Sequence, residues 1–285
     1  MDLHDYAIDT NIVTENDPRV RKKISQPTFS RVSVENATVS HQDVIQFLSG
    51  LPSASVDLIV TDPAYSGMNQ HLKLGKGRIV GQYNQKGNEG KWFDEFHDTP
   101  ENYKLFLKQC ERVLKPDRHL FIMFDSYSML TLGATVRDYF NVKNVITWDK
   151  VNIGMGHYFR RQTEFILFAC KGKRPISRRD IPDIWKIKRL HRAPYPTQKP
   201  VELFEAMIAS SKESKDRNFV VCDPFVGSGS AAIAALRQGA NFIGCDISSK
   251  AIDLCRERLE SYMKNQIDIH QSKPAFNPET QKKFW

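Results

Sequence analysis

Short apolar runs alternate with helical patterns of apolar positions along most of the chain. The runs are rich in Val, Ile and Phe, as expected of strands that are buried on both faces. They occupy residues 56–60, 119–124, 144–147, 163–170, 218–222 and 241–245, with a weaker run at 37–39. Helical periodicity lies between them, at residues 101–114, 127–140, 201–212, 230–238 and 249–264. This alternation predicts an open α/β sheet with helices on both faces.

One connection departs from simple alternation. Only a short polar span separates the runs at 144–147 and 163–170, so we expect the second strand to return antiparallel to the first. The sheet is therefore predicted to be mostly parallel, with an antiparallel hairpin at one edge. Polar, irregular sequence at both ends predicts an N-terminal arm over 1–30 and a C-terminal tail over 266–285, flanking one domain at 31–265.

The composition predicts a protein with a sizeable core. Of the 285 residues, 40% are hydrophobic, and no apolar run reaches membrane-spanning length. The polar, acidic start lacks the basic and apolar regions of a secretory signal, so we expect a cytoplasmic protein without membrane association. The five cysteines are scattered without a close pair, which argues against a disulfide framework or a zinc site. We expect buried, reduced thiols and no metal.

The net charge adds a class of partner. A formal charge of +8 favours a polyanion, although many basic proteins bind no nucleic acid. Much of this charge falls between the expected core elements, in a Gly- and Asn-rich stretch within 66–95 and in a second stretch within 171–195. Aromatic and amide side chains accompany both stretches, among them Trp185. Contact with DNA phosphates and a solvated surface both stay open for each cluster.

A glycine-containing turn joins the last two strands. The first of them runs into Asp223, the turn DPFVGSG contains Gly227 and Gly229, and the next strand ends in Asp246. Glycines let the backbone approach a ligand closely, and a strand-end acid can accept hydrogen bonds from ribose hydroxyls. An ordinary α/β turn is the alternative. A nicotinamide site lacks the third glycine of its fingerprint here, whereas an acid before the turn suits a cofactor with an ammonium group.

A second motif follows the apolar strand at 56–60. Asp62, Pro63, Ala64 and Tyr65 place a carboxylate, a proline-fixed turn and an aromatic ring at the carboxyl end of this strand, where open α/β sheets bind ligands. Asp-Pro after a strand is also a common turn initiator. The tetrapeptide alone therefore leaves a catalytic site and a simple turn open.

Together, these motifs resemble the β class of amino-directed DNA methyltransferases, which modify adenine N6 or cytosine N4. That family has a D/S-P-P-Y tetrapeptide, a PTQKP-VEL segment and an F-x-G-x-G turn, and here DPAY, APYPTQKPVEL and DPFVGSG follow in the same order. Further matches are Gln42–Asp43, KPDRHLFIMFD at 115–125 and ITWDKVNIGMG at 146–156, so the resemblance spans roughly 35–262. Ala64 replaces the second proline of the family, which leaves this turn less rigid.

The resemblance implies a Rossmann-like, S-adenosylmethionine-dependent methyltransferase fold with a circularly permuted order of motifs. The strands before Asp62 and Asp223 should then be central neighbours, which brings the two motifs into one pocket. It also implies that Tyr65 stacks on an extruded base, while Asp62 and the Pro63 carbonyl accept hydrogen bonds from the amino group of that base. The predicted catalytic residues are Asp62, Pro63 and Tyr65.

The implied cofactor is S-adenosylmethionine. Asp223 and the turn after it should face the methionine end, Asp246 should hold the ribose, and Asp43 is a candidate for the adenine edge. For Lys199, a surface lysine at a helix start is the alternative. The predicted cofactor-binding residues are Asp43, Thr197, Lys199, Asp223, Phe225, Gly227, Gly229 and Asp246.

Double-stranded DNA is the implied partner, and dimerisation within the family keeps a homodimer open. Residues 66–95 are the predicted DNA-contacting loop insertion, and the basic stretch 171–195 is the candidate for target recognition. The predicted DNA-binding residues are Lys73, Lys76, Arg78, Lys86, Arg178, Arg179, Lys188 and Arg189.

The sequence leaves two possible target atoms, adenine N6 and cytosine N4. Aspartate at the start of the tetrapeptide resembles the adenine enzymes, whereas serine is commoner in the cytosine group, so we expect a site-specific adenine-N6 methyltransferase, with cytosine N4 as the alternative. A catalytically silent DNA- or cofactor-binding subunit is the alternative from another class. The intact Asp62, Pro63, Tyr65 and glycine turn argue against it. A restriction-modification system, a phage genome and a regulatory pathway are all open as the context.

The loop insertion can be tested by its charge. Replacing Lys73, Lys76, Arg78 and Lys86 together with alanine should weaken DNA binding and flatten its salt dependence, because fewer counterions are released. Cofactor affinity should stay unchanged. Fluorescence anisotropy with duplex DNA at several salt concentrations measures both effects on binding. If the variant binds and methylates DNA normally at every salt concentration, the loop is only a spacer.

Overall fold

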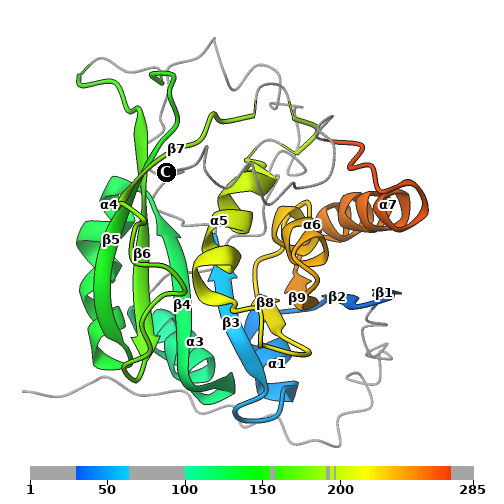
Figure 1. Ribbon diagram of the computed structural model, residues 1–285, viewed down its shortest axis with the longest axis horizontal. Coiled ribbons are helices and arrows are strands. Elements are labelled where there is room, and N and C mark those ends of the chain that lie inside the picture. Colours follow the sequence, from blue (N-terminus) through cyan, green and yellow to red (C-terminus); the bar gives the residue numbers. More distant parts are fainter. Residues whose placement is uncertain (1–29, 64–99, 155–157, 191–192, 196, 271–285) are drawn as a thin grey trace, which may run out of the picture.

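The computed structural model describes residues 30–63, 100–154, 158–190, 193–195 and 197–270 (Figure 1). Several of the predicted site residues lie outside these ranges. They are Tyr65, Lys73, Lys76, Arg78 and Lys86.

Nine strands in the described ranges form one sheet, in the order β1-β2-β9-β8-β3-β4-β6-β5-β7. The strands are β1 (Arg31–Val34), β2 (Ala37–His41), β3 (Val56–Thr61), β4 (Leu114–Phe124), β5 (Asn141–Asp149), β6 (Thr163–Lys171), β7 (Ile184–Lys186), β8 (Val220–Asp223) and β9 (Asn241–Asp246). From β2 to β4 the neighbours are parallel, whereas β6 is antiparallel to both β4 and β5. The mostly parallel sheet, its antiparallel hairpin and the pairing of β3 with β8 are therefore confirmed.

Helices cover both faces of the sheet (Figure 1). Buried side chains of α5, α6 and α7 form one core cluster, and those of α1, α3 and α4 form a second cluster. Leu58 and Val60 of β3 belong to the first cluster and Ile59 to the second, so this strand is buried from both sides. That burial explains its continuous apolar run. The helices are α1 (Val44–Gly50), α3 (Pro100–Val113), α4 (Ser126–Leu132), α5 (Val201–Ser211), α6 (Ser230–Arg237) and α7 (Ser249–Asn265).

Several short elements differ from the sequence prediction. β1 pairs antiparallel with β2, β7 pairs parallel with β5, and α1 begins directly after Asp43. The predicted helix over 127–140 is divided, because α4 ends at Leu132 and a 3-10 helix, Gly133–Asp138, follows. Glycine at the division lowers the helix propensity of the segment. β1, β7 and α1 were not predicted, because they are too short for hydrophobic periodicity to indicate them.

The five cysteines and two tryptophans lie in the core. All five thiols are free and buried, as expected. Trp148 is buried, and its Nε1 donates to the Ile187 carbonyl at 2.7 Å. The sequence analysis counted Trp185 among the aromatic side chains that could accompany nucleic acid, and this is wrong. Trp185 is only 1% exposed, and its Nε1 donates to the Pro182 carbonyl. Its ring therefore packs in the core and is not available to stack on a base. None of the described helices is long and apolar enough to cross a membrane.

A buried ion pair fastens the chain after α7. Arg258 of α7 and Asp268 are both fully buried, and Arg258 Nη2 lies 2.6 Å from Asp268 Oδ2. Arg258 Nη1 also donates to the Ser228 carbonyl at 2.8 Å, within the turn before α6. Asp268, which the sequence analysis placed in the C-terminal tail, therefore packs inside the domain and supports the glycine turn.

We expect Asp268→Ala to lower the free energy of unfolding by about 3–5 kcal/mol, because it leaves a buried guanidinium without its counter-charge. Urea denaturation measures this. Asp253→Ala is the matched control, since Asp253 forms an exposed ion pair with Arg256 on the same helix, and its loss should have little effect. Equal effects of the two substitutions would contradict the role of the buried pair.

Candidate active site

The carboxyl ends of three neighbouring parallel strands bring three aspartates to one edge of the sheet (Figure 1). Asp223 and Asp246 are the last residues of β8 and β9, and Asp62 follows the last residue of β3. Thr61 Oγ1 donates to Asp223 Oδ1 at 3.0 Å, which links the ends of β3 and β8. Motifs that are 162 residues apart in sequence thus meet at the edge where α/β sheets bind ligands.

The glycine turn between β8 and α6 depends on positive φ angles. Gly227 and Gly229 have φ of 53° and 87°, in the left-handed region that glycine adopts without strain. A Cβ atom at Gly229 would also lie 2.5 Å from the Cys255 sulfur. The Gly227 N–H donates to Asp246 Oδ2 at 2.8 Å, and the Phe225 N–H donates to Asp223 Oδ1 at 3.0 Å. The turn is therefore held between the two strand-end carboxyl groups.

These carboxyl groups make the edge suitable for a cation. Burial raises the pKa of Asp223 to about 8, against hydrogen bonds from the Phe225 N–H and the Thr61 hydroxyl that lower it. Burial also raises the pKa of Asp246, and the N–H groups of Ser248 and Gly227 oppose this. A nearby ammonium or sulfonium would favour the ionised form of both groups.

Lys199 lies at Asp62. Its ammonium group donates to Asp62 Oδ2 and lies 3.7 Å from Glu164 Oε2. The Lys199 carbonyl accepts a hydrogen bond from Ser230 Oγ at 2.8 Å, which ties the start of α5 to the start of α6. The sequence analysis assigned Lys199 to the cofactor, but its ammonium contacts the predicted catalytic carboxylate. It is not the surface lysine of the alternative interpretation.

Two charged residues at this edge were not predicted. Glu164, near the start of β6, accepts a hydrogen bond from Lys150 at 2.9 Å. Although burial raises the pKa of Glu164, the charges of Lys199 and Lys150 outweigh it and hold this pKa below its usual value. Although burial lowers the pKa of Lys199, Asp62 and Glu164 outweigh it and raise this pKa. The sequence signal for Glu164 and Lys150 was a charged residue at one end of an apolar strand, at the edge of the sheet that binds ligands.

The other predicted cofactor residues occupy different positions along the same edge. Asp43 Oδ1 accepts hydrogen bonds from the N–H groups of Ile45 and Gln46, so Asp43 caps α1. It follows β2, whose last residue, His41, is paired in register with Asp246. Thr197 is exposed, two residues before Lys199. Pro63 is buried beside Asp62.

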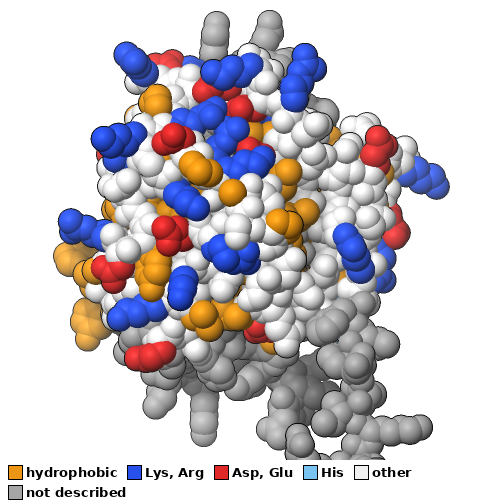
Figure 2. All heavy atoms as spheres, turned by 90° about the horizontal axis from the view of Figure 1, so that it is seen from below, with side chains coloured by type: hydrophobic (Ala, Val, Ile, Leu, Met, Phe, Trp, Pro, Cys, Tyr) orange, Lys and Arg blue, Asp and Glu red, His pale blue; other side chains and the backbone are white. Residues whose placement is uncertain are grey.

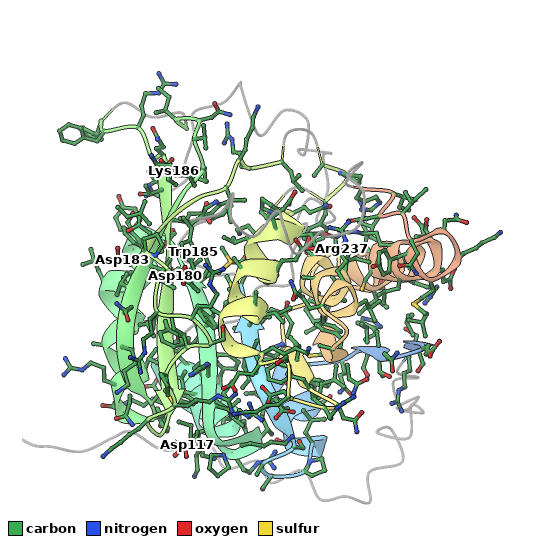
Figure 3. All side chains as sticks on the ribbon, in the orientation of Figure 1. Asp117, Asp180, Asp183, Trp185, Lys186 and Arg237 are labelled. Atoms are coloured by element: carbon green, nitrogen blue, oxygen red, sulfur yellow. The ribbon has the colours of Figure 1, made fainter. Side chains whose placement is uncertain are left out.

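The structure divides the basic stretch 171–195 between the two edges of the sheet. Its last strand, β7, runs parallel to β5, so Lys188 and Arg189 follow it at the carboxyl edge, and both are exposed. Figure 3 shows Lys186 of β7 at this edge and Asp117 at the opposite one. The Lys173 N–H donates to Asp117 Oδ1 at 2.9 Å, so the stretch begins at the amino edge.

At the amino edge the basic residues are largely paired. Arg174 lies 2.7 Å from Glu213 and 3.1 Å from Asp216. In the view of that face, Lys and Arg side chains gather with acidic side chains among them (Figure 2). Further along the stretch, Arg178 pairs with Asp180, which Figure 3 shows between Asp117 and Lys186, and Arg179 is exposed beside it. Of the candidates in this stretch, Lys188 and Arg189 are thus the two at the edge of the aspartates.

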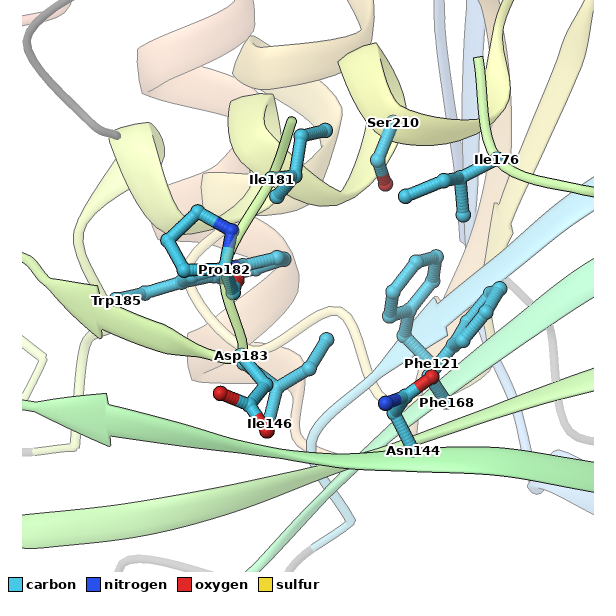
Figure 4. A pocket seen from close by; sticks show the side chains of 10 residues that line it. All are labelled: Phe121, Asn144, Ile146, Phe168, Ile176, Ile181, Pro182, Asp183, Trp185 and Ser210. Atoms are coloured by element: carbon cyan, nitrogen blue, oxygen red, sulfur yellow. The ribbon is translucent and has the colours of Figure 1, made fainter. Parts of the chain in front are cut away.

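A separate pocket lies between the sheet and the segment before β7 (Figure 4). Aromatic and aliphatic side chains line most of it, including Phe121, Phe168 and Trp185. Ser210, which also lines it, belongs to the last turn of α5, whereas Lys199 precedes the first turn. None of the strand-end aspartates lines this pocket, so it is not the site described above.

Comparison with known proteins agrees with this geometry. Residues 56–257 match the family model of the N6/N4 methyltransferases, described as DNA methylase. The chain is similar to the Type II methyltransferase M2.DpnII of Streptococcus pneumoniae, with 29% identity over 245 residues, which cover 78% of this chain and 88% of the relative.

Two solved structures share the fold. One is M1.HpyAVI in complex with SAM, with a TM-score of 0.55 and 21% identity over 78% of this chain and 99% of the other. The second is the cytosine-N4-specific PvuII DNA methyltransferase, with a TM-score of 0.56 and 14% identity over 79% and 88%. The family match spans most of the chain, from the strand before Asp62 to α7. The chain belongs to the N6/N4 DNA methylase family.

Proposed function

We propose that this protein is a site-specific DNA methyltransferase that transfers a methyl group from S-adenosylmethionine to adenine N6 in double-stranded DNA. The observation that carries the proposal is the position of Asp62, which lies at the carboxyl end of β3 beside the glycine turn of β8. Lys199 donates to Asp62 Oδ2, and within the described residues no hydrogen bond to Asp62 Oδ1 is formed. We assign Oδ1 to a substrate amino group.

The residues at the edge fit S-adenosylmethionine. The buried carboxyl groups of Asp223 and Asp246 favour a cationic ligand, and Asp246 would accept hydrogen bonds from ribose hydroxyls. The first turn of α6 has no side-chain cap, which leaves backbone N–H groups for a carboxylate. Gly227 adopts a positive φ, and a Cβ atom there would lie 3.3 Å from the Tyr195 ring, so this turn needs glycine. When bound, this cofactor supplies a methyl group activated by the sulfonium.

In the reaction, the protein's residues would accept hydrogen bonds from the amino group and align the reacting atoms. Asp62 and the Pro63 carbonyl would accept from the two amino N–H groups, which localises the nitrogen lone pair and offsets the positive charge that develops on nitrogen. A base in duplex DNA must leave the stack to reach this edge. Tyr65 would stack on the extruded base, as the resemblance implies. Holding nitrogen, methyl and sulfur in line contributes further to the rate.

The acid that opens the tetrapeptide favours adenine over cytosine. Asp62 stands where the cytosine enzymes of the family more commonly have serine. The fold likeness to the cytosine-N4-specific PvuII enzyme supports cytosine N4 as the second candidate. The similarity to a Type II methyltransferase favours a restriction-modification system as the context. Lys188 and Arg189 are the candidates for phosphate contacts at the carboxyl edge.

Methylation of unmodified genomic DNA with labelled S-adenosylmethionine tests the proposal. Nucleoside analysis should find the label in N6-methyladenine, and methylation-aware sequencing should place it at a short, defined sequence. Label in N4-methylcytosine would show that cytosine N4, the second candidate, is the target. A purified protein that binds the cofactor but labels no DNA would reject the proposed function.

Asp62→Ala should reduce methyl transfer by roughly a thousandfold, because a charge-assisted acceptor for the amino group is lost. Single-turnover rates with a labelled cofactor measure the loss. Calorimetry serves as the control, since cofactor affinity should remain close to that of the unmodified protein. Near-normal turnover would show that Asp62 is not catalytic.

Asp246→Ala should weaken cofactor binding by about 1–3 kcal/mol, because the ribose hydroxyls lose a charged acceptor and the Gly227 N–H loses its partner. Isothermal calorimetry measures the affinity directly. Asp253→Ala, an exposed change on α7, is the control. Unchanged affinity in the Asp246 variant would show that this carboxyl group does not face the cofactor.

A further inference from the structure

Four charged side chains of alternating sign form a row along the carboxyl edge. The ammonium of Lys199 lies between the carboxylates of Asp62 and Glu164, and Lys150 lies beyond Glu164 at 2.9 Å. The side chains are only 11–27% exposed. They come from the end of β3, the segment before α5, the start of β6 and the residue after β5. We call this set the charge row.

The charge row crosses the sheet at the end of β4, which lies between β3 and β6. Asp125 follows β4 and caps α4, where its Oδ1 accepts from the Ser128 N–H at 2.8 Å. Its Oδ2 lies 3.8 Å from Arg161. Within the described ranges, Asp223 and Tyr195 are the other titratable groups near Asp62. Lys199 is the cation that contacts Asp62 among the described residues.

This setting makes the charge of Asp62 depend on its neighbours. Burial raises the pKa of Asp62, and the charges of Glu164 and Asp125 raise it further, while Lys199 opposes them. A protonated carboxyl group is a poor acceptor for an amino N–H. The ammonium is shared with Glu164, so the share left for Asp62 depends on how strongly Lys150 compensates Glu164.

We propose that Glu164 and Lys150 are positioning residues for Asp62, which act through Lys199 to hold its ammonium at Oδ2 and to leave Oδ1 for the substrate. The acceptor role of Oδ1 rests on the proposed function, whereas the coupling along the charge row does not. The two oxygens of Asp62 thus have different proposed roles: Oδ2 binds the Lys199 ammonium, and Oδ1 accepts from the substrate.

The proposal predicts the direction in which each substitution changes the pKa of Asp62. Lys199→Met removes the cation at Asp62 and should raise the apparent pKa of Asp62 by about one unit or more. Glu164→Gln removes a like charge and a competitor for Lys199, so the pKa of Asp62 should fall. Lys150→Met leaves Lys199 as the only cation at Glu164, so the pKa of Asp62 should rise by less than in Lys199→Met. Lys199→Arg keeps the charge and should restore most of the original value.

Carbon-13 NMR of the full-length protein, labelled at the aspartate carboxyl carbon, measures the pKa directly, with Asp62→Asn identifying the resonance. Glu213→Gln is the matched control, because Glu213 pairs with Arg174 and Lys215 away from this row. Thermal unfolding of each variant checks that it folds. Where Lys199→Met does not fold, Glu164→Gln and Lys150→Met carry the test.

Opposite shifts of the Asp62 pKa in Glu164→Gln and Lys150→Met, with none in Glu213→Gln, support the proposal. No shift in either of the first two variants overturns it. The acid limb of the single-turnover rate should move in the same direction as the pKa. If the shifts occur as expected but the unmodified protein transfers no methyl group to DNA, the charge row stands and the proposed function fails.

Discussion

The contact between Lys199 and Asp62 is the interaction on which the site depends. It joins residues that are 137 positions apart in sequence, at a place where burial opposes the ionisation of both. Neither charge would be stable there alone, because an unpaired buried charge costs several kcal/mol. The pair therefore fixes the start of α5 against the end of β3. Ser230 extends this link to α6, so the start of α6 and Asp62 are fixed relative to each other.

Sheet order explains how motifs that are far apart in sequence meet at one edge of the sheet. The hydrophobic pattern was enough to predict β3, β8 and β9, because strands buried on both faces have continuous apolar sequence. It could not reveal β1, β7 or α1, because elements of 4, 3 and 7 residues are too short for a hydrophobic repeat to stand out from the surrounding sequence. Trp185 misled the sequence analysis for a related reason. An aromatic ring in a basic, irregular stretch gives no sign of being covered by the chain on both sides.

The site was partly predictable from sequence. Asp62, Asp223, Asp246 and the two glycines belong to motifs at the ends of predicted strands, so their position at one edge of the sheet could be predicted. Glu164 and Lys150 were not predicted. Glu164 meets Lys199, and Lys150 meets Glu164, because β6 runs antiparallel between β4 and β5. Their partnership depends on strand register, and sequence pattern does not specify which strand ends lie side by side.

The boundary between β8 and β3 separates two kinds of chemistry. On one side, β8 and β9 end in carboxyl groups held by backbone N–H donors, with no lysine or arginine ion-paired to them among the described residues, which suits a cationic ligand. On the other side, Asp62 after β3 and Glu164 near the start of β6 are carboxylates paired with lysines, which suits a neutral amino group that needs a fixed acceptor. Asp62 lies at the boundary, and Thr61 beside it donates across to Asp223. A methyl donor bound on the first side and an amino group bound on the second would therefore meet at the paired ends of β3 and β8.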